Sequence, residues 1–89
     1  MKINKNFALR KVANTWVVLP LAEATVNLNG MLKLNESGVL LWNALEKGSD
    51  RQELVSILTS EYEVSEEQAR ADVDEFLFKL IKVGCIDEQ

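Results

Sequence analysis

Residues 31–48 read MLKLNESGVLLWNALEKG, a short strand that continues without a linker into a helix. Asn35 is the predicted N-cap, because its side-chain oxygen can accept a hydrogen bond from a free amide in the first turn. Gly48 is the predicted stop, since the residue just past the last turn is often a left-handed glycine. The helix between them is apolar nearly all round, so we expect other elements to cover it on several sides.

Two strands are predicted upstream of this stretch. Residues 7–13 alternate apolar and polar side chains, and residues 15–19, TWVVL, are rich in β-branched and aromatic side chains. Asn14 is a turn former, so the two segments should form a hairpin. Pro20 has no amide to donate, so the second strand should end there or lie at a sheet edge. Residues 1–6 are polar and are expected to be disordered.

A second hairpin is signalled by the pair Asn29-Gly30, the strongest two-residue turn signal in the chain. It would pair a short strand at residues 25–28 with the strand at residues 31–34. The sequence leaves open whether this pairing occupies the edge of the strand at 31–34 or leaves that edge free.

The pattern changes to helices after Gly48. Residues 49–53, SDRQE, contain two overlapping capping boxes, and apolar residues follow at helical spacing. Ser65 is the predicted cap of the last helix and Gly84 its stop. Residues 85–86 should fold back onto the core.

This order of elements predicts one α+β domain over residues 1–89: a small antiparallel sheet of three to four strands followed by three helices. Short helices joined by tight turns also suit a winged helix-turn-helix arrangement.

Composition argues against several classes of protein. The formal net charge is −4 and the basic residues are scattered, whereas binding to nucleic acid is built on clustered Lys and Arg. No histidine is present and Cys85 is the single cysteine, so no zinc site with the usual ligands can be written. The most apolar early stretch is short and contains Pro20, which speaks against a signal peptide or membrane span. We therefore expect a cytoplasmic protein without cofactor, metal, nucleic acid or membrane.

Catalysis is also unsupported by the sequence. It contains no nucleophile–base pair and no glycine-rich phosphate loop. Cys85 follows a helix C-terminus, where the helix dipole raises a thiol pKa, and is interpreted as a small buried apolar residue. The expectation is a protein that is not an enzyme.

The last helix carries apolar side chains away from its predicted core line. At about 100° per residue, Ala69, Val73, Phe76 and Leu80 fall on one line, and Phe78 lies nearly opposite. An exposed apolar patch of this kind tends to mark a binding surface. The alternative is that Phe78 covers a second helix or the N-terminal strands. The flank between the core line and Phe78 holds Arg70, Asp74, Leu77 and Ile81.

Several segments of the chain, in this order and spacing, resemble the PqqD family over about residues 8–88: WVVLP, MLKLNESGVLLWNALEKG, ELVSIL and ADVDEFLFKLIKVGCI. The resemblance implies a winged-helix-like peptide-binding domain, also called a RiPP recognition element. Such a domain binds the leader segment of a ribosomally made precursor peptide and presents it to a modifying enzyme, often a radical SAM protein.

In that family the leader adds to the sheet as a strand, in a groove between the strand before the first helix and the third helix. The pattern of this sequence separately favours the same two elements, the strand at 31–34 and the flank of the last helix. Carried over by position, the expected peptide-binding residues are Met31, Leu32, Lys33, Leu34, Arg70, Val73, Asp74, Leu77, Phe78 and Ile81.

Two other interpretations remain open from the sequence. A winged-helix transcription regulator would need a basic recognition helix, but the last helix is acidic. A dimerising structural module would pack Phe78 against its symmetry mate, so a homodimer is an alternative to monomeric peptide recognition.

Overall fold

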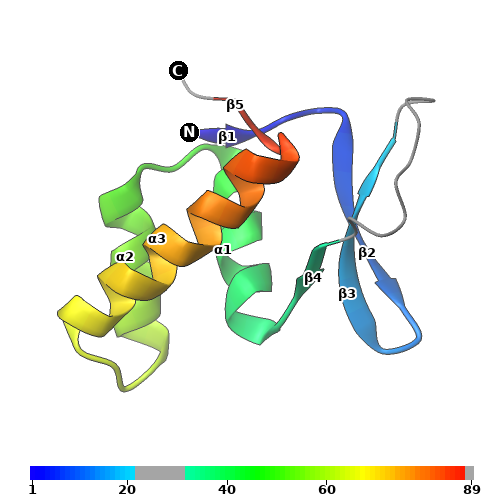
Figure 1. Ribbon diagram of the computed structural model, residues 1–89. Helices are drawn as coiled ribbons and strands as arrows, with labels where there is room; N and C mark the ends of the chain where they lie inside the picture. Colours follow the sequence, from blue (N-terminus) through cyan, green and yellow to red (C-terminus); the bar gives the residue numbers. More distant parts are fainter. Residues whose placement is uncertain (22–31, 88–89) are drawn as a thin grey trace.

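The computed structural model describes residues 1–21 and 32–87. Three helices form one side of the molecule and a small antiparallel sheet forms the other, while a separate two-stranded sheet joins the two ends of the chain (Figure 1). The predicted α+β class is confirmed. The elements are β1 (Lys2–Ile3), β2 (Phe7–Val12), β3 (Thr15–Pro20), β4 (Leu32–Leu34), α1 (Glu36–Lys47), α2 (Arg51–Glu61), α3 (Glu66–Val83) and β5 (Ile86–Asp87).

The main sheet has the order β2-β3-β4, so β3 is its central strand and both of its neighbours are antiparallel to it. The predicted hairpin is confirmed. Its two turn residues, Ala13 and Asn14, have φ of 49° and 66°, the left-handed conformation that two-residue hairpin turns of type I′ require. Pro20 is the last residue of β3, as its missing amide predicts. The predicted strand at 25–28 and the Asn29-Gly30 turn lie outside the described residues.

The β4–α1 junction is built as its sequence predicts. The Asn35 side-chain oxygen accepts from the amide of Gly38 at 2.9 Å and from the hydroxyl of Ser37 at 2.9 Å. Gly48 ends α1 with a φ of 95°, a conformation that favours glycine. Because Asn35 caps the helix directly after Leu34, it is the only residue between the end of β4 and the start of α1.

The core is centred on α1, which is covered from several sides as expected. Trp42 and Leu45 are fully buried and Leu41 is 2% exposed. They pack in one cluster with Val18 and Leu34 of the sheet and with apolar residues of α2 and α3. The helix therefore connects the sheet to the other two helices.

Helices α2 and α3 begin at caps that the sequence indicates. The capping box that forms joins Asp50 to Glu53: the Glu53 amide donates to Asp50 Oδ1 at 2.8 Å and the Asp50 amide donates to Glu53 Oε1 at 3.0 Å. The hydroxyl of Ser65 accepts from the Gln68 amide at 3.0 Å, and α3 ends at Gly84 with a φ of 89°. The caps fix where both helices begin, and Gly84 fixes where α3 ends.

Loss of the α2 capping box should destabilise the protein measurably. We expect Asp50→Ala to lower the free energy of unfolding by about 1 kcal/mol, the usual cost of removing an N-cap side chain. Urea unfolding followed by circular dichroism measures this, with Ser60→Ala on the exposed side of α2 as the control. Equal stability of the two variants would show that the cap contributes nothing.

The ends of the chain depart from expectation. Residues 1–6 were expected to be disordered, and this prediction is wrong: β1 pairs antiparallel with β5, with Lys2 opposite Asp87 and Ile3 opposite Ile86. Ile3 is 7% exposed and belongs to the core cluster. The return of residues 85–86 to the core is confirmed, because Cys85 is fully buried and Ile86 packs against the core. Burial raises the pKa of the Cys85 thiol to about 11.

Candidate functional site

A groove of about 520 Å³ lies between the β4–α1 junction and α3. Within the described residues β4 pairs with β3 alone, so its second edge has no strand partner there. In the view of Figure 1, α3 passes across α1, and its C-terminal end lies near β1 and β5. The residues that line the groove are Leu32, Lys33, Leu34, Asn35, Ser37, Gly38 and Leu41 on one side and Asp72, Glu75, Phe76 and Lys79 on the other.

The floor of the groove is apolar. Leu41 and Gly38 are buried, and Phe76 is half-buried against the core cluster. A Cβ atom on Gly38 would lie 3.3 Å from Leu34 Cβ and 3.3 Å from Asn35 Oδ1, closer than ordinary packing contact. Glycine at this position therefore keeps the floor clear and leaves the helix cap undistorted.

The rim of the groove carries charges of both signs. Lys79 Nζ lies 3.3 Å from Glu75 Oε1 along α3, and Asp72 accepts a hydrogen bond from Gln68 Nε2 at 2.9 Å. Lys33 adds an exposed ammonium from β4. The groove can thus pair charged or polar groups of either sign around an apolar centre.

The structure brings together only part of the predicted site. Leu32, Lys33 and Leu34 line the groove, and Met31 lies outside the described residues. None of the six predicted residues of α3 lines it. Val73 is fully buried, Leu77 is 7% exposed, and Phe78 and Ile81 are exposed outside the groove.

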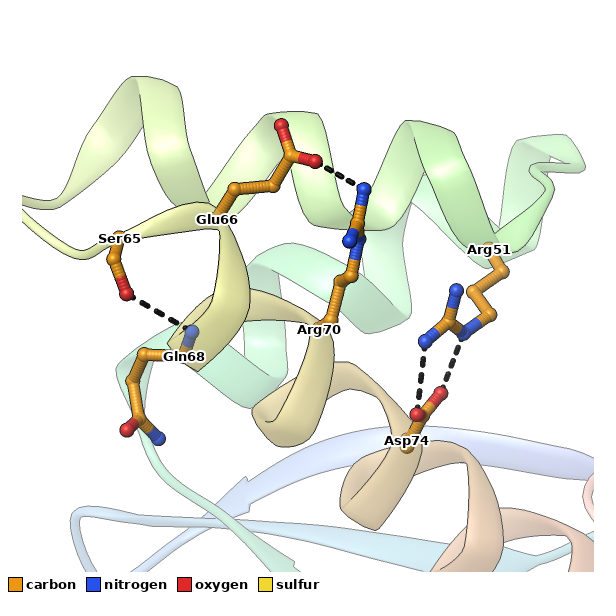
Figure 2. A network of polar contacts seen from close by, with 6 residues as sticks. All are labelled: Arg51, Ser65, Glu66, Gln68, Arg70 and Asp74. Atoms are coloured by element: carbon orange, nitrogen blue, oxygen red, sulfur yellow. Dashed lines mark hydrogen bonds and ion pairs between the residues drawn. The ribbon is translucent and has the colours of Figure 1, made fainter.

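Two of the predicted residues, Asp74 and Arg70, form ion pairs outside the groove (Figure 2). Asp74 accepts two hydrogen bonds from Arg51 at the start of α2, from Nε at 2.6 Å and from Nη2 at 2.9 Å. Arg70 forms an ion pair with Glu66 one turn earlier on α3. Arg70 and Asp74 therefore belong to the side of α3 that faces α2.

The difference comes from the position of the core line on α3. The buried residues are Ala69, Val73, Leu77 and Leu80, so Leu77 takes the core position that periodicity assigned to Phe76. The assignment of Leu77 to the flank outside the core line is thus wrong. Two flanks border this line, and the helical period does not say which one faces β4. The residues missed on the other flank recur at intervals of three and four: Asp72, Glu75, Phe76 and Lys79.

The Asp74–Arg51 pair gives a pH-dependent contribution to stability. Hydrogen bonding to Arg51 is the main cause that holds the pKa of Asp74 below its ordinary value. A carboxyl with a lowered folded-state pKa contributes stability above its unfolded pKa, near 4, and loses it as the pH falls through the folded value. We expect Asp74→Asn to be less stable than the parent at pH 6 and equally stable in strong acid.

Urea unfolding at several pH values measures this difference, with Glu67→Gln as a matched change of an exposed carboxyl on the same helix. If the free energies of unfolding of Asp74→Asn and the parent still differ at low pH, the ion pair is not the cause of the difference.

Other kinds of site are not seen in the part of the chain that the structure describes. No group of three or more His, Cys, Asp or Glu side chains there is arranged to hold a metal ion. None of the helices of residues 1–21 and 32–87 is long and apolar enough to span a bilayer.

Solved structures similar to this chain contain bound peptides. One is described as "TbiB1 in Complex with the TbiA(beta) Leader Peptide"; it is 25% identical, has a TM-score of 0.78, and the match covers 100% of this chain and 98% of that chain. The other is described as "Lasso peptide synthetase B1 complexed with the leader peptide", with 21% identity, a TM-score of 0.73, and coverage of 94% and 93%. No curated protein sequence matches this chain.

The sequence profile of the family described as "Coenzyme PQQ synthesis protein D (PqqD)" matches residues 15–86. That range runs from the start of β3 to the first residue of β5, and it includes the whole groove beside β4. The matched residues cover most of the chain and include β3, β4 and the three helices. The chain belongs to the PqqD family.

Proposed function

We propose that the groove beside β4 binds the leader segment of a ribosomally made precursor peptide. The observation that carries this proposal is an edge of β4 without a strand partner in the described residues, next to an apolar-floored groove of about 520 Å³. Membership of the PqqD family and the similar fold of TbiB1, described in complex with a leader peptide, support it.

Strand addition explains how such a groove would recognise an extended peptide. The backbone of Leu32–Leu34 supplies N–H and C=O groups to the added strand, independent of the peptide sequence. Alternate peptide side chains then point to the same side, where Phe76 and Leu41 offer apolar contact. Lys33 and Asp72 at the rim orient charged groups of the peptide and so contribute selectivity.

The helical half of the binding site is accordingly assigned to the flank of α3 that faces β4. Of the residues expected from the sequence, the strand residues are retained. Phe78 and Ile81 lie on exposed surface outside the groove, and Arg70 and Asp74 are held by ion pairs.

In this function the protein catalyses nothing itself. It holds the leader and presents the rest of the precursor to a separate modifying enzyme, for which the family resemblance indicates the radical SAM class. A cytoplasmic setting fits the single cysteine, Cys85, which is buried as a free thiol.

The test first searches the genes near that of this protein for a short precursor peptide, and then titrates the protein with the synthetic leader of that peptide. We expect one peptide bound per chain, and slower hydrogen exchange of the amides of residues 32–34 in the complex. A scrambled leader of equal composition is the control. Equal binding of the scrambled peptide, or unchanged exchange at β4, would contradict strand addition.

A further inference from the structure

A second cavity, of about 430 Å³, lies where the β2–β3 hairpin meets the first turns of α1 and the end of α2. It shares no lining residue with the groove beside β4, and peptide binding in that groove does not use it. At about 100° per residue, the residues of α1 that line the two sites lie on nearly opposite faces of the helix. The lining residues are Lys11, Asn14, Trp16, Glu36, Val39, Leu40, Glu61 and Tyr62.

A positive charge already lies against one wall of this cavity, because Lys11 is opposite Trp16 in the β2–β3 hairpin. Lys11 Nζ lies 5.8 Å from the centroid of the Trp16 ring, within the range of a cation–π contact. Val39, Leu40 and the Tyr62 ring complete an apolar, partly aromatic wall. A flat cationic group could replace Lys11 on the Trp16 ring with little loss, because Lys11 is exposed and free to turn into solvent.

The charges of the cavity are unbalanced. Two carboxylates, Glu36 and Glu61, face one ammonium, that of Lys11, and neither carboxylate forms an ion pair within the described residues. One negative charge therefore remains uncompensated. Such a cavity repels phosphates and other anions and favours a monocation.

The hydroxyl of Tyr62 is a further polar group without a partner. Its oxygen is buried and makes no hydrogen bond within the described residues. Burial raises the pKa of this phenol, and the charges of Glu36 and Glu61 raise it further, so it stays protonated and neutral near pH 7. The neutral phenol therefore adds no charge of its own to the cavity.

We propose that this cavity binds the guanidinium group of an arginine side chain that a partner protein presents. A guanidinium is planar, so it can stack on Trp16 while its N–H groups donate to the carboxylates of Glu36 and Glu61. Lysine could supply the charge but not the planar stacking. The cavity is thus a second docking point, separate from the peptide groove, for a protein with an exposed arginine.

The test uses small probes and the whole protein. N-acetyl-arginine-N-methylamide is titrated while the indole N–H signal of Trp16 is followed by NMR, with the fully buried Trp42 as an internal reference. We expect a saturable shift at Trp16. The citrulline counterpart is neutral and of the same shape, and it should bind at least about tenfold more weakly. Equal binding of the two probes would overturn the assignment.

Variants of the cavity give predictions of opposite sign. Glu36→Gln and Glu61→Gln should each lower the affinity for the arginine probe about two- to fivefold, as expected for a partly exposed charge pair. Lys11→Gln should raise this affinity, because the competing ammonium is removed. Glu67→Gln, outside the cavity, is the control. Unchanged affinity in both glutamate variants, or weaker binding in Lys11→Gln, would contradict the proposal.

Two more measurements separate this site from its alternatives. Free L-arginine carries its own ammonium and carboxylate; if it binds more than tenfold tighter than the blocked probe, the cavity takes a metabolite and the partner-protein assignment fails. Phe76→Ala, in the other site, should leave the titration unchanged. The arginine site can therefore fail or hold independently of leader binding.

Discussion

Replacing Phe76 by alanine is expected to weaken leader binding by at least about tenfold, whereas Phe78→Ala should leave it unchanged. The two phenylalanines are two residues apart on α3, but Phe76 lines the groove and Phe78 is 64% exposed outside it. A buried aromatic side chain near the centre of an interface commonly accounts for 2 kcal/mol or more of binding free energy. Fluorescence anisotropy of a labelled leader measures both variants against the parent.

The controls for this pair must separate folding from binding. Phe76 also packs against the core, so Phe76→Ala should lose some stability, and thermal melting has to show that the variant is folded at the assay temperature. Phe76→Leu keeps an apolar side chain in the groove and should lose less affinity. The reverse result, loss with Phe78→Ala and none with Phe76→Ala, would move the helical half of the site to the exposed side of α3 that carries Phe78.

Replacing Trp42 by alanine is expected to destabilise the domain strongly. Trp42 is fully buried at the centre of the core cluster. Truncation of such a side chain costs about 3–5 kcal/mol, against a total of only about 5–15 kcal/mol for a small domain. We expect the urea midpoint to fall by at least about a fifth, and by more than half if the total lies near the lower end of that range, as measured by circular dichroism.

Trp42→Phe should be much milder, for a reason visible in the structure. The indole N–H of Trp42 is buried without a hydrogen-bond partner in the described part of the chain, and burying an unpaired donor costs about 1–3 kcal/mol. Phenylalanine removes that donor while it leaves a smaller cavity than alanine does. The expected net loss is below about 2 kcal/mol. A Phe variant as unstable as the Ala variant would contradict this prediction.

Those parts of the fold that depend on neighbouring residues could be read from the sequence. Asn35, Asp50 and Ser65 cap helices because each side chain lies within reach of amides three residues later. Gly84 ends α3 because its left-handed φ favours glycine. The hairpin at Asn14 has the same local origin.

The parts that depend on distant contacts could not be read in this way. The pairing of β1 with β5 joins residue 2 to residue 87, and two-residue strands carry no periodicity of their own. On α3, Phe76 and Leu77 are both large and apolar, and each fits one edge of the core line. The position of α3 relative to α1 and β4 decides that Leu77 is buried and that Phe76 lines the groove.

The pairing of β1 with β5 also places both ends of the described chain side by side, and neither strand lines the groove. An enzyme fused at either end would therefore be tethered at the same point on the surface. The length of the linker, rather than the choice of terminus, would set the effective concentration of a bound peptide at that enzyme. The same closeness means that a short loop can join the ends and that new termini can be opened at the Ala13-Asn14 turn, a circular permutation that leaves the groove intact.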